Sequence, residues 1–260
     1  MLHHEISGNG KKPLVLLHGF MENTTIWEEM EAHLSKDFTL IKIDLPGHGK
    51  SKVYQEIHTV ELMAEKVKEV IDALKLEKIN LLGHSLGGYV SLAFAEKFPE
   101  ILESMTLFFS TTVADDEEKK QIRRRSIAVI DENFETFVKT SIPNLFSNNE
   151  KDILEGKIEL AKNIAKSTNK EGVKAAQLGM AERPDRTEIL ENLDAKILII
   201  AGKYDNAVKT ENLLKIIPEK TNIKTYVLDC GHNGHWEKPT ICAEIINTEL
   251  LHNLPKHFLL

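Results

Sequence analysis

Short apolar runs recur along the chain, and most of them end at glycine or at an acidic residue. Apolar runs of about four to eight residues, bounded by turn residues, are typical of strands that a parallel sheet buries on both faces. Six strands are predicted on this basis: residues 14–17, 38–43, 79–82, 102–109, 196–201 and 223–228.

Segments with apolar residues at helical spacing separate these predicted strands. Over residues 60–74 the apolar positions recur every three or four residues, so one face of this segment is expected to pack on the sheet as a helix, with Thr59 as its N-cap. Three further helices are predicted: residues 86–98, 210–217 and 239–253. Strands and helices that alternate in this way predict an α/β fold, with a mostly parallel central sheet flanked by helices.

The alternation stops over residues 110–193, where helical periodicity and many charges occur without a convincing strand. We therefore predict a core formed by residues 1–109 and 194–260, into which residues 110–193 are inserted as a helical cap. The cap is expected to cover the site and to help select the substrate.

An acidic run, residues 115–118, opens the predicted cap and is followed by two lysines and by Arg123, Arg124 and Arg125. This order predicts a solvated amphipathic helix, because acidic residues near a helix N-terminus interact favourably with the helix dipole. The alternative is that some of these arginines point inward and bind a carboxylate of the substrate.

Residues 83–87 read Gly-His-Ser-Leu-Gly, a G-x-S-x-G motif between a predicted strand and a predicted helix. In this context Ser85 lies on a sharp turn that exposes its hydroxyl, and the two glycines remove side chains that would collide there. The helix N-terminus supplies unpaired N–H groups, of which Leu86 N–H is our first candidate for an oxyanion donor. The motif predicts Ser85 as a nucleophile in acyl transfer, and an incidental serine at a glycine-rich junction is the alternative.

A second oxyanion donor is expected in the loop after an earlier strand. His18, Gly19 and Phe20 end the first predicted strand, so we predict Phe20 N–H as this donor and give His18 a structural role in holding the loop. Residues 44–49, which read Asp-Leu-Pro-Gly-His-Gly, are dense in turn residues and predict a rigid loop rather than a proton-transfer or phosphate site.

A serine hydroxyl needs a base within hydrogen-bond reach and a group that orients the base. Asp205 follows the predicted strand 196–201, while His232 and His235 follow the predicted strand 223–228. Both loops begin at carboxyl ends of strands, where the active sites of such sheets lie. These loops therefore supply a candidate acid and two candidate bases.

From the His18-Gly19 loop to its last predicted helix, the chain resembles the α/β-hydrolase superfamily, whose triads follow the order serine, acid, histidine. In that family the base is the histidine directly after glycine in a G-H-x-x-x-x-E-x-P pattern. This pattern falls on Gly231, His232, Glu237 and Pro239. The resemblance implies His232 as the base, with His235 as its neighbour.

The orienting acid has several candidates, and loop position favours Asp205. Asp229 and Glu237 are rivals, although their closeness to His232 in the sequence makes the required approach awkward. Some members of the superfamily take the acid from the loop after the preceding strand, where Asp115 and Asp116 are nearest.

Relatives in this superfamily that cleave haloalkanes or epoxides have an aspartate nucleophile where this chain has Ser85. The serine implies an acyl-enzyme mechanism, in which Ser85 attacks a carbonyl, His232 takes and returns the proton, and the two amides hold the oxyanion. Six residues are expected to form a substrate pocket near the serine: Met21, Trp27, Tyr89, Phe109, Phe146 and Trp236. Such a pocket fits a small or medium carboxylic ester, thioester or lactone.

Two other functions stay open. Gly231-His232-Asn233 also resembles the menaquinone-pathway lyase 2-succinyl-6-hydroxy-2,4-cyclohexadiene-1-carboxylate synthase, which uses the same triad. That enzyme has an arginine just after the double glycine, where this chain has Tyr89, so Arg123 to Arg125 would have to bind the carboxylate. The third function is a non-catalytic ligand-binding member of the fold, against which the intact triad argues.

Composition narrows the expected partners. The 260 residues carry a net charge of -7, which offers no electrostatic attraction to nucleic acid or to an anionic membrane. Only two cysteines occur and the first residues do not read as a secretory signal, so a cytoplasmic location is expected. We expect a small-molecule substrate, no cofactor and no metal, and we leave a homodimer open.

Overall fold

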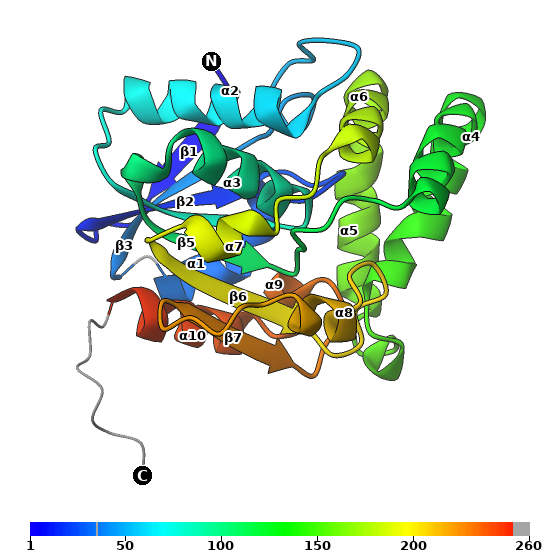
Figure 1. Ribbon diagram of the computed structural model, residues 1–260. Coiled ribbons are helices and arrows are strands. Elements are labelled where there is room, and N and C mark those ends of the chain that lie inside the picture. Colours follow the sequence, from blue (N-terminus) through cyan, green and yellow to red (C-terminus); the bar gives the residue numbers. More distant parts are fainter. Residues whose placement is uncertain (35, 252–260) are drawn as a thin grey trace.

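A seven-stranded sheet forms the centre of the computed structural model, which describes residues 1–34 and 36–251 (Figure 1). Its strand order is β1-β3-β2-β4-β5-β6-β7, and every neighbouring pair is parallel except β1 with β3. The strands are β1 His4–Ser7, β2 Lys12–Leu17, β3 Phe38–Ile43, β4 Ile79–His84, β5 Leu102–Phe108, β6 Lys196–Gly202 and β7 Ile223–Leu228. The α/β architecture and the mostly parallel sheet are thus confirmed.

Helices cover both faces of this sheet, with α2 and α3 on one face and α1 and α10 on the other (Figure 1). The α-helices are α1 Glu28–Leu34, α2 Val60–Ala73, α3 Leu86–Lys97, α4 Glu117–Ser141, α5 Glu155–Ser167, α6 Lys170–Glu182, α7 Glu188–Asn192, α8 Thr210–Lys215, α9 Gly234–Glu237 and α10 Pro239–Leu251. Short 3-10 helices span Thr24–Trp27, Pro99–Ile101, Ile142–Leu145 and Asn148–Glu150.

All six predicted strands are present, with small shifts at their ends. β5 stops at Phe108 instead of Phe109, because Phe109 has a φ of 49°, in the left-handed region that a strand does not allow. The sequence pattern misses β1, which holds a single apolar residue, Ile6, among its four residues and so forms no apolar run, and it also misses the short helix α1.

The predicted helices are also present, and Thr59 caps α2 by accepting a hydrogen bond from Leu62 N–H. α3 and α8 end one and two residues earlier than predicted, at Lys97 and Lys215. α10 is described to Leu251, so the predicted positions 252 and 253 lie outside the described residues.

Alternate residues along each central strand enter two separate hydrophobic clusters. Val15 and Leu17 of β2 pack with α2 and α3, whereas Leu14 and Leu16 pack with α1 and α10. The period of two is that of a strand buried on both faces. This packing fixes the sheet, and with it the loops at the carboxyl ends of β4, β6 and β7.

Between β5 and β6 the described chain holds only helical elements and loops. α4, α5 and α6, coloured green, stand together at one end of the sheet (Figure 1). α4 is interrupted at Asn133, whose backbone is not helical and whose side chain accepts a hydrogen bond from Thr136 N–H, as an N-cap does. α7, the last helix of residues 110–193, packs against α3.

The start of α4 only partly matches the expected solvated helix. Asp116 caps the helix by accepting a hydrogen bond from Lys119 N–H, and Arg124 and Arg125 are exposed. The expectation is wrong for Asp115, which is buried and accepts hydrogen bonds from the guanidinium groups of Arg123, at 2.5 Å, and Arg183, at 2.9 Å. The carboxylate that Arg123 binds is therefore one of this chain's own.

Close backbone contacts seat α6 on the loops of the core. His58 N–H donates a hydrogen bond to the Ala175 carbonyl of α6, at 3.0 Å. A Cβ added at Gly179 would collide with the His58 carbonyl, and one added at Gly172 would collide with the backbone of Gly47. Glycine is needed at these positions because the two backbones approach so closely.

Gly179→Ala is expected to lower the free energy of unfolding by about 1–3 kcal/mol, because the collision with the His58 carbonyl outweighs the better helix propensity of alanine. The matched control is Gly156→Ala in α5, where an added Cβ meets nothing within 4 Å. That variant should be as stable as the parent or gain up to about 1 kcal/mol. Urea unfolding measures both, and equal gains in the two variants would contradict the close packing of α6.

Candidate active site

Ser85 occupies a strained turn between β4 and α3. Its φ of 49° and ψ of -110° lie outside the regions that L-residues usually adopt. Its N–H donates to the Phe108 carbonyl, at 3.0 Å, and its own carbonyl accepts from the Ser110 hydroxyl, at 2.8 Å. A Cβ at Gly83 would collide with the backbone of Gly87, so the turn requires the small residues of the motif.

The Ser85 hydroxyl begins a chain of hydrogen bonds that ends at Asp205. Ser85 Oγ lies 2.8 Å from His232 Nε2, and His232 Nδ1 lies 2.7 Å from Asp205 Oδ2. Because the carboxylate only accepts, Nδ1 carries the proton and Nε2 is free to accept from the serine. The other oxygen, Asp205 Oδ1, accepts the N–H groups of Ala207 and Val208, each at 2.8 Å. These bonds fix the carboxylate that orients the ring.

The environment of His232 makes it a stronger base than an ordinary histidine. Burial on its own would lower the pKa of His232, but the charge and hydrogen bond of Asp205 outweigh burial and raise that pKa. His232 and Asp205 are 2% and 5% exposed, so water screens this pair only weakly.

The rival acids have other partners. Asp229 is exposed and pairs with Lys203, at 3.2 Å, and Asp116 caps α4. Glu237 accepts backbone N–H groups from Gly231, Ser147 and Asn233. Of the carboxylates considered from the sequence, Asp205 is the one in contact with the His232 ring.

His235, the rival base, lies behind the triad. It is fully buried, and neither ring nitrogen has a hydrogen-bond partner among the described residues. Burial and the nearby His84 hold the pKa of His235 well below its ordinary value, so its ring is neutral. The ring packs edge-on against His84 with centroids 4.6 Å apart.

The two expected oxyanion donors lie on the loops next to Ser85. Phe20 belongs to a tight turn in which Glu22 N–H donates to the Gly19 carbonyl and Met21 has a φ of 58°. Leu86 is the first residue of α3, where amides have no acceptor within the helix. Neither the Phe20 nor the Leu86 N–H has an acceptor within residues 1–34 and 36–251.

His18 holds the base of the Phe20 loop, as expected from the sequence. Its Nδ1–H donates to the Gly19 carbonyl, at 2.7 Å, and its Nε2 accepts the N–H of Leu45, at 2.9 Å. Burial lowers the pKa of His18, which keeps the ring neutral for these two opposite roles.

A small void lies between the Phe20 turn, helical residues of the segment 110–193 and the loop of His232, and its volume of about 10 Å³ is room for about one water molecule. Met21 and Trp236, two of the six expected pocket residues, line it. The full lining is Phe20, Met21, Glu22, Ile142, Leu145, Ala161, Asn233 and Trp236.

The other four expected pocket residues are not among those that line this void. Phe146 stacks on Trp236 with ring centroids 6.0 Å apart, and Phe109 contacts Phe108 and His84. Trp27 lies against Phe108 and His235 in the core. Tyr89 lies under the guanidinium group of Arg183, which is 3.9 Å from its ring centroid.

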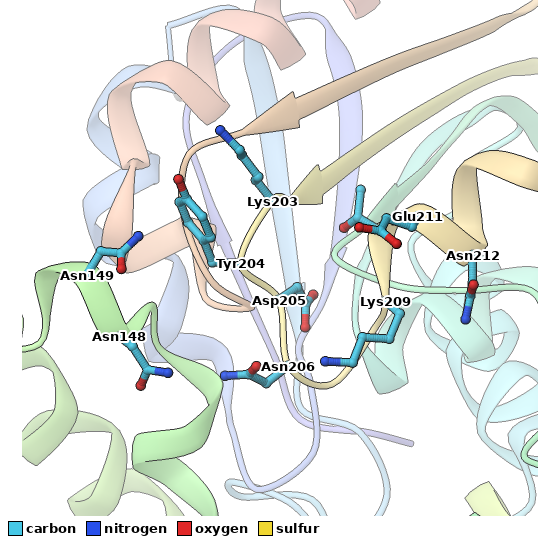
Figure 2. Close-up of a pocket in the computed structure, with 10 residues that line it drawn as sticks. Asn148, Asn149, Lys203, Tyr204, Asp205, Asn206, Lys209, Glu211 and Asn212 are labelled. Carbon is cyan, nitrogen blue, oxygen red and sulfur yellow. The ribbon is translucent and has the colours of Figure 1, made fainter.

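A larger cleft of about 380 Å³ opens on the surface beside the β6–α8 loop (Figure 2). Its walls are polar and include Asp205, Lys209 and Asn148 of the cap. Neither Ser85 nor His232 lines this cleft or the void beside Phe20. In the cleft, both carboxylate oxygens of Asp205 are already bonded, to His232 and to backbone amides.

Glu22, His84 and His235 lie close enough to share a cation, with their ligand atoms all within 4.8 Å of one another. His84, however, already contacts an oxygen atom with each ring nitrogen: Glu22 Oε2 at 2.8 Å and the His232 carbonyl at 3.0 Å. Hydrogen bonds thus account for the approach of Glu22 to His84 without an ion.

Comparison with known proteins assigns the family. Residues 12–239 match the alpha/beta hydrolase fold family, and the chain therefore belongs to it. An esterase from Thermogutta terrifontis is 33% identical, covers 96% of this chain and 93% of its own, and superposes with a TM-score of 0.89. A putative 2-succinyl-6-hydroxy-2,4-cyclohexadiene-1-carboxylate synthase of Bacillus subtilis is 28% identical over 92% of this chain and 90% of that protein.

A further relative, an uncharacterized protein of Mycobacterium tuberculosis, is 34% identical over 111 residues. That match spans 43% of this chain and 32% of the relative's own length. Among the described residues, none of the helices is both long and apolar enough to cross a lipid bilayer.

The raised pKa of His232 can be measured directly. By NMR titration we expect His232 to titrate above its ordinary value of 6.5, and Asp205→Asn should move the titration to lower pH, because burial then acts without the opposing charge. Since the base works in its neutral form, the acid limb of any activity profile should follow the same shift. Asp229→Asn, which removes an exposed carboxylate, is the control, and an equal shift there would contradict the role of Asp205.

Proposed function

We propose that this protein is a serine hydrolase for small or medium carboxylic esters, thioesters or lactones. The continuous hydrogen-bonded chain from Ser85 through His232 to Asp205 is the observation that supports this function. The similarity to an esterase along nearly the whole chain agrees with it. The substrate is a small molecule, and residues 110–193 act as the cap that covers it.

The proposed reaction proceeds in two halves. Ser85 Oγ attacks the carbonyl carbon while His232 Nε2 takes the hydroxyl proton, and the Phe20 and Leu86 amides donate to the oxyanion. Collapse of the tetrahedral intermediate expels the alcohol or thiol, which takes the proton from His232. Water then attacks the acyl-enzyme with His232 as base, and release of the acid restores Ser85.

Ser85→Ala is expected to lower kcat/KM for p-nitrophenyl acetate by at least about 10⁴-fold, because the nucleophile is lost. Ser91→Ala removes another buried serine, whose hydroxyl bonds to the Gly87 carbonyl within α3, and should change activity little.

His232→Ala should abolish most activity, whereas His235→Phe should retain it.

A fluorophosphonate probe tests the nucleophile independently of any substrate. We expect a single adduct on Ser85, found by mass spectrometry, and no labelling in Ser85→Ala. If folded wild-type protein is neither labelled nor active on the esters, the hydrolase proposal is wrong, and a ligand-binding role takes its place.

The void beside Phe20 favours short acyl groups. Its volume of about 10 Å³ has room for about one water-sized group next to Phe20, the proposed oxyanion donor, and Ile142 and Leu145 line it. We expect kcat/KM to fall from acetate to octanoate p-nitrophenyl esters. Ile142→Ala should raise octanoate activity relative to acetate, and an unchanged preference would show that the acyl chain lies elsewhere.

The second candidate function is the menaquinone-pathway elimination, which the similarity to the Bacillus subtilis protein favours. The arginines considered for carboxylate binding speak against it, because Arg123 is held by Asp115 and Gln177 and the next two arginines are exposed. Formation of 2-succinyl-6-hydroxy-2,4-cyclohexadiene-1-carboxylate from the pathway intermediate by purified protein would support the lyase, and no turnover would exclude it.

A further inference from the structure

A second histidine–carboxylate pair lies directly behind the triad. His84 Nδ1 is 2.8 Å from Glu22 Oε2, and the rings of His84 and His232 are 5.1 Å apart between centroids. Glu22 is 7% exposed and His84 is 1% exposed. The proposed hydrolysis gives these two residues no role in proton transfer, yet burying them is costly unless they are paired.

The hydrogen bonds define the charges of this pair. His84 Nε2 faces the His232 carbonyl, at 3.0 Å, which can only accept, so Nε2 carries a proton. Glu22 Oε2 already accepts the Gly19 N–H, at 2.6 Å. Burial would raise the pKa of Glu22, but the charge and hydrogen bond of His84 lower it to about 2. Facing an ionised carboxylate and a carbonyl, both ring nitrogens of His84 are placed to donate, which is the arrangement that suits an imidazolium.

Each partner of the pair contacts a different part of the proposed machinery. The Glu22 carboxylate accepts a hydrogen bond from Gly19 N–H and so stabilises the turn that contains the Phe20 amide. In the same turn Met21 has a left-handed backbone. His84 is the residue before the nucleophile. Its other nitrogen holds the carbonyl of His232, the base itself.

The Glu22–His84 pair is packed closely against the backbone of Gly19. A Cβ added at Gly19 would lie 2.7 Å from both Glu22 Oε2 and His84 Nδ1, so the pair occupies the space that a side chain would need. Left-handed backbone at a non-glycine residue costs about 1–2 kcal/mol, and such residues persist only where their surroundings hold them. Met21 and Ser85 are both in this conformation.

We propose that the Glu22–His84 ion pair is a positioning element that holds the oxyanion turn, the nucleophile turn and the base in one geometry. This inference rests on the proposed hydrolase function. The effect of the pair passes through the Phe20 amide, Ser85 and the His232 carbonyl. A misplacement of about 1 Å in such a site costs about 10²-fold in rate.

Glu22→Gln tests the pair, because glutamine still accepts from Gly19 N–H but cannot balance an imidazolium. We expect kcat to fall by about 10²-fold while KM changes by less than about threefold. Affinity for a trifluoromethyl ketone, which forms a tetrahedral oxyanion on Ser85, should fall by the same factor as kcat/KM. If the pair is purely structural, Glu22→Gln should lower thermal stability without a selective fall in kcat.

A double variant covers the case in which the single variant does not fold. Glu22→Gln combined with His84→Gln leaves no unpaired buried charge, so it is expected to fold and yet to show the loss in kcat. Where the single variants fold, their effects should not add, because the two residues act as one unit. A folded double variant with wild-type kcat would overturn the inference.

The control removes a carboxylate from a different ion pair. Arg186 is bound by Glu61 of α2 and by Glu96 in the last turn of α3, the end of that helix remote from Ser85. Glu96→Gln should lower the melting temperature without changing kcat. Labelling and activity of the wild-type protein distinguish failure of the hydrolase proposal from failure of the positioning proposal. An inactive, unlabelled wild type refutes the hydrolase function and this inference together, whereas an active wild type with an equally active Glu22→Gln refutes the positioning role alone.

Discussion

The backbone at Ser85 is held at a φ of 49° and a ψ of -110°, and the rest of the site is arranged around that turn. Such strain costs about 1–3 kcal/mol and persists only where the surroundings over-determine it. Here the Phe108 carbonyl and the Ser110 hydroxyl bind the turn from β5 and its following loop. The hydrogen bonds that hold the strained backbone therefore come from the buried central sheet and the loop that follows β5.

Two buried histidine–carboxylate pairs lie next to this turn, and they differ in the hydrogen bonds that their histidine rings make. In the Asp205–His232 pair one ring nitrogen faces the Ser85 hydroxyl, whereas both nitrogens of His84 face oxygen atoms of Glu22 and of the His232 carbonyl. Backbone N–H groups also bind both carboxylates: two bind Asp205 and one binds Glu22. The hydrogen-bond partners of the two rings are thus the basis for proposing a reactive pair and a positioning pair.

Local signals explain what could be predicted from the sequence. Ser85 lies in a contiguous motif, and Asp205 and His232 follow apolar strands directly, so a pattern along the chain was enough to nominate them. Glu22 carries no such signal, since its partner His84 is 62 positions away and only the fold brings them together. β1 was missed because its pairing with β3 at the sheet edge, and not an apolar run, defines it.

The charges of residues 110–193, the proposed cap, bear on the kind of substrate proposed for the site. The buried guanidinium of Arg183 stacks on Tyr89, but it also donates to Asp115 and to the carbonyls of Met180 and Val113. A substrate carboxylate would have to displace Asp115, whose pKa is lowered because the two arginines offset the cost of its burial. The void beside Phe20 is lined mainly by apolar side chains. These contacts support the proposal of an uncharged acyl group over the carboxylate-bearing substrate of the lyase, although both proposed chemistries would begin with Ser85, His232 and Asp205.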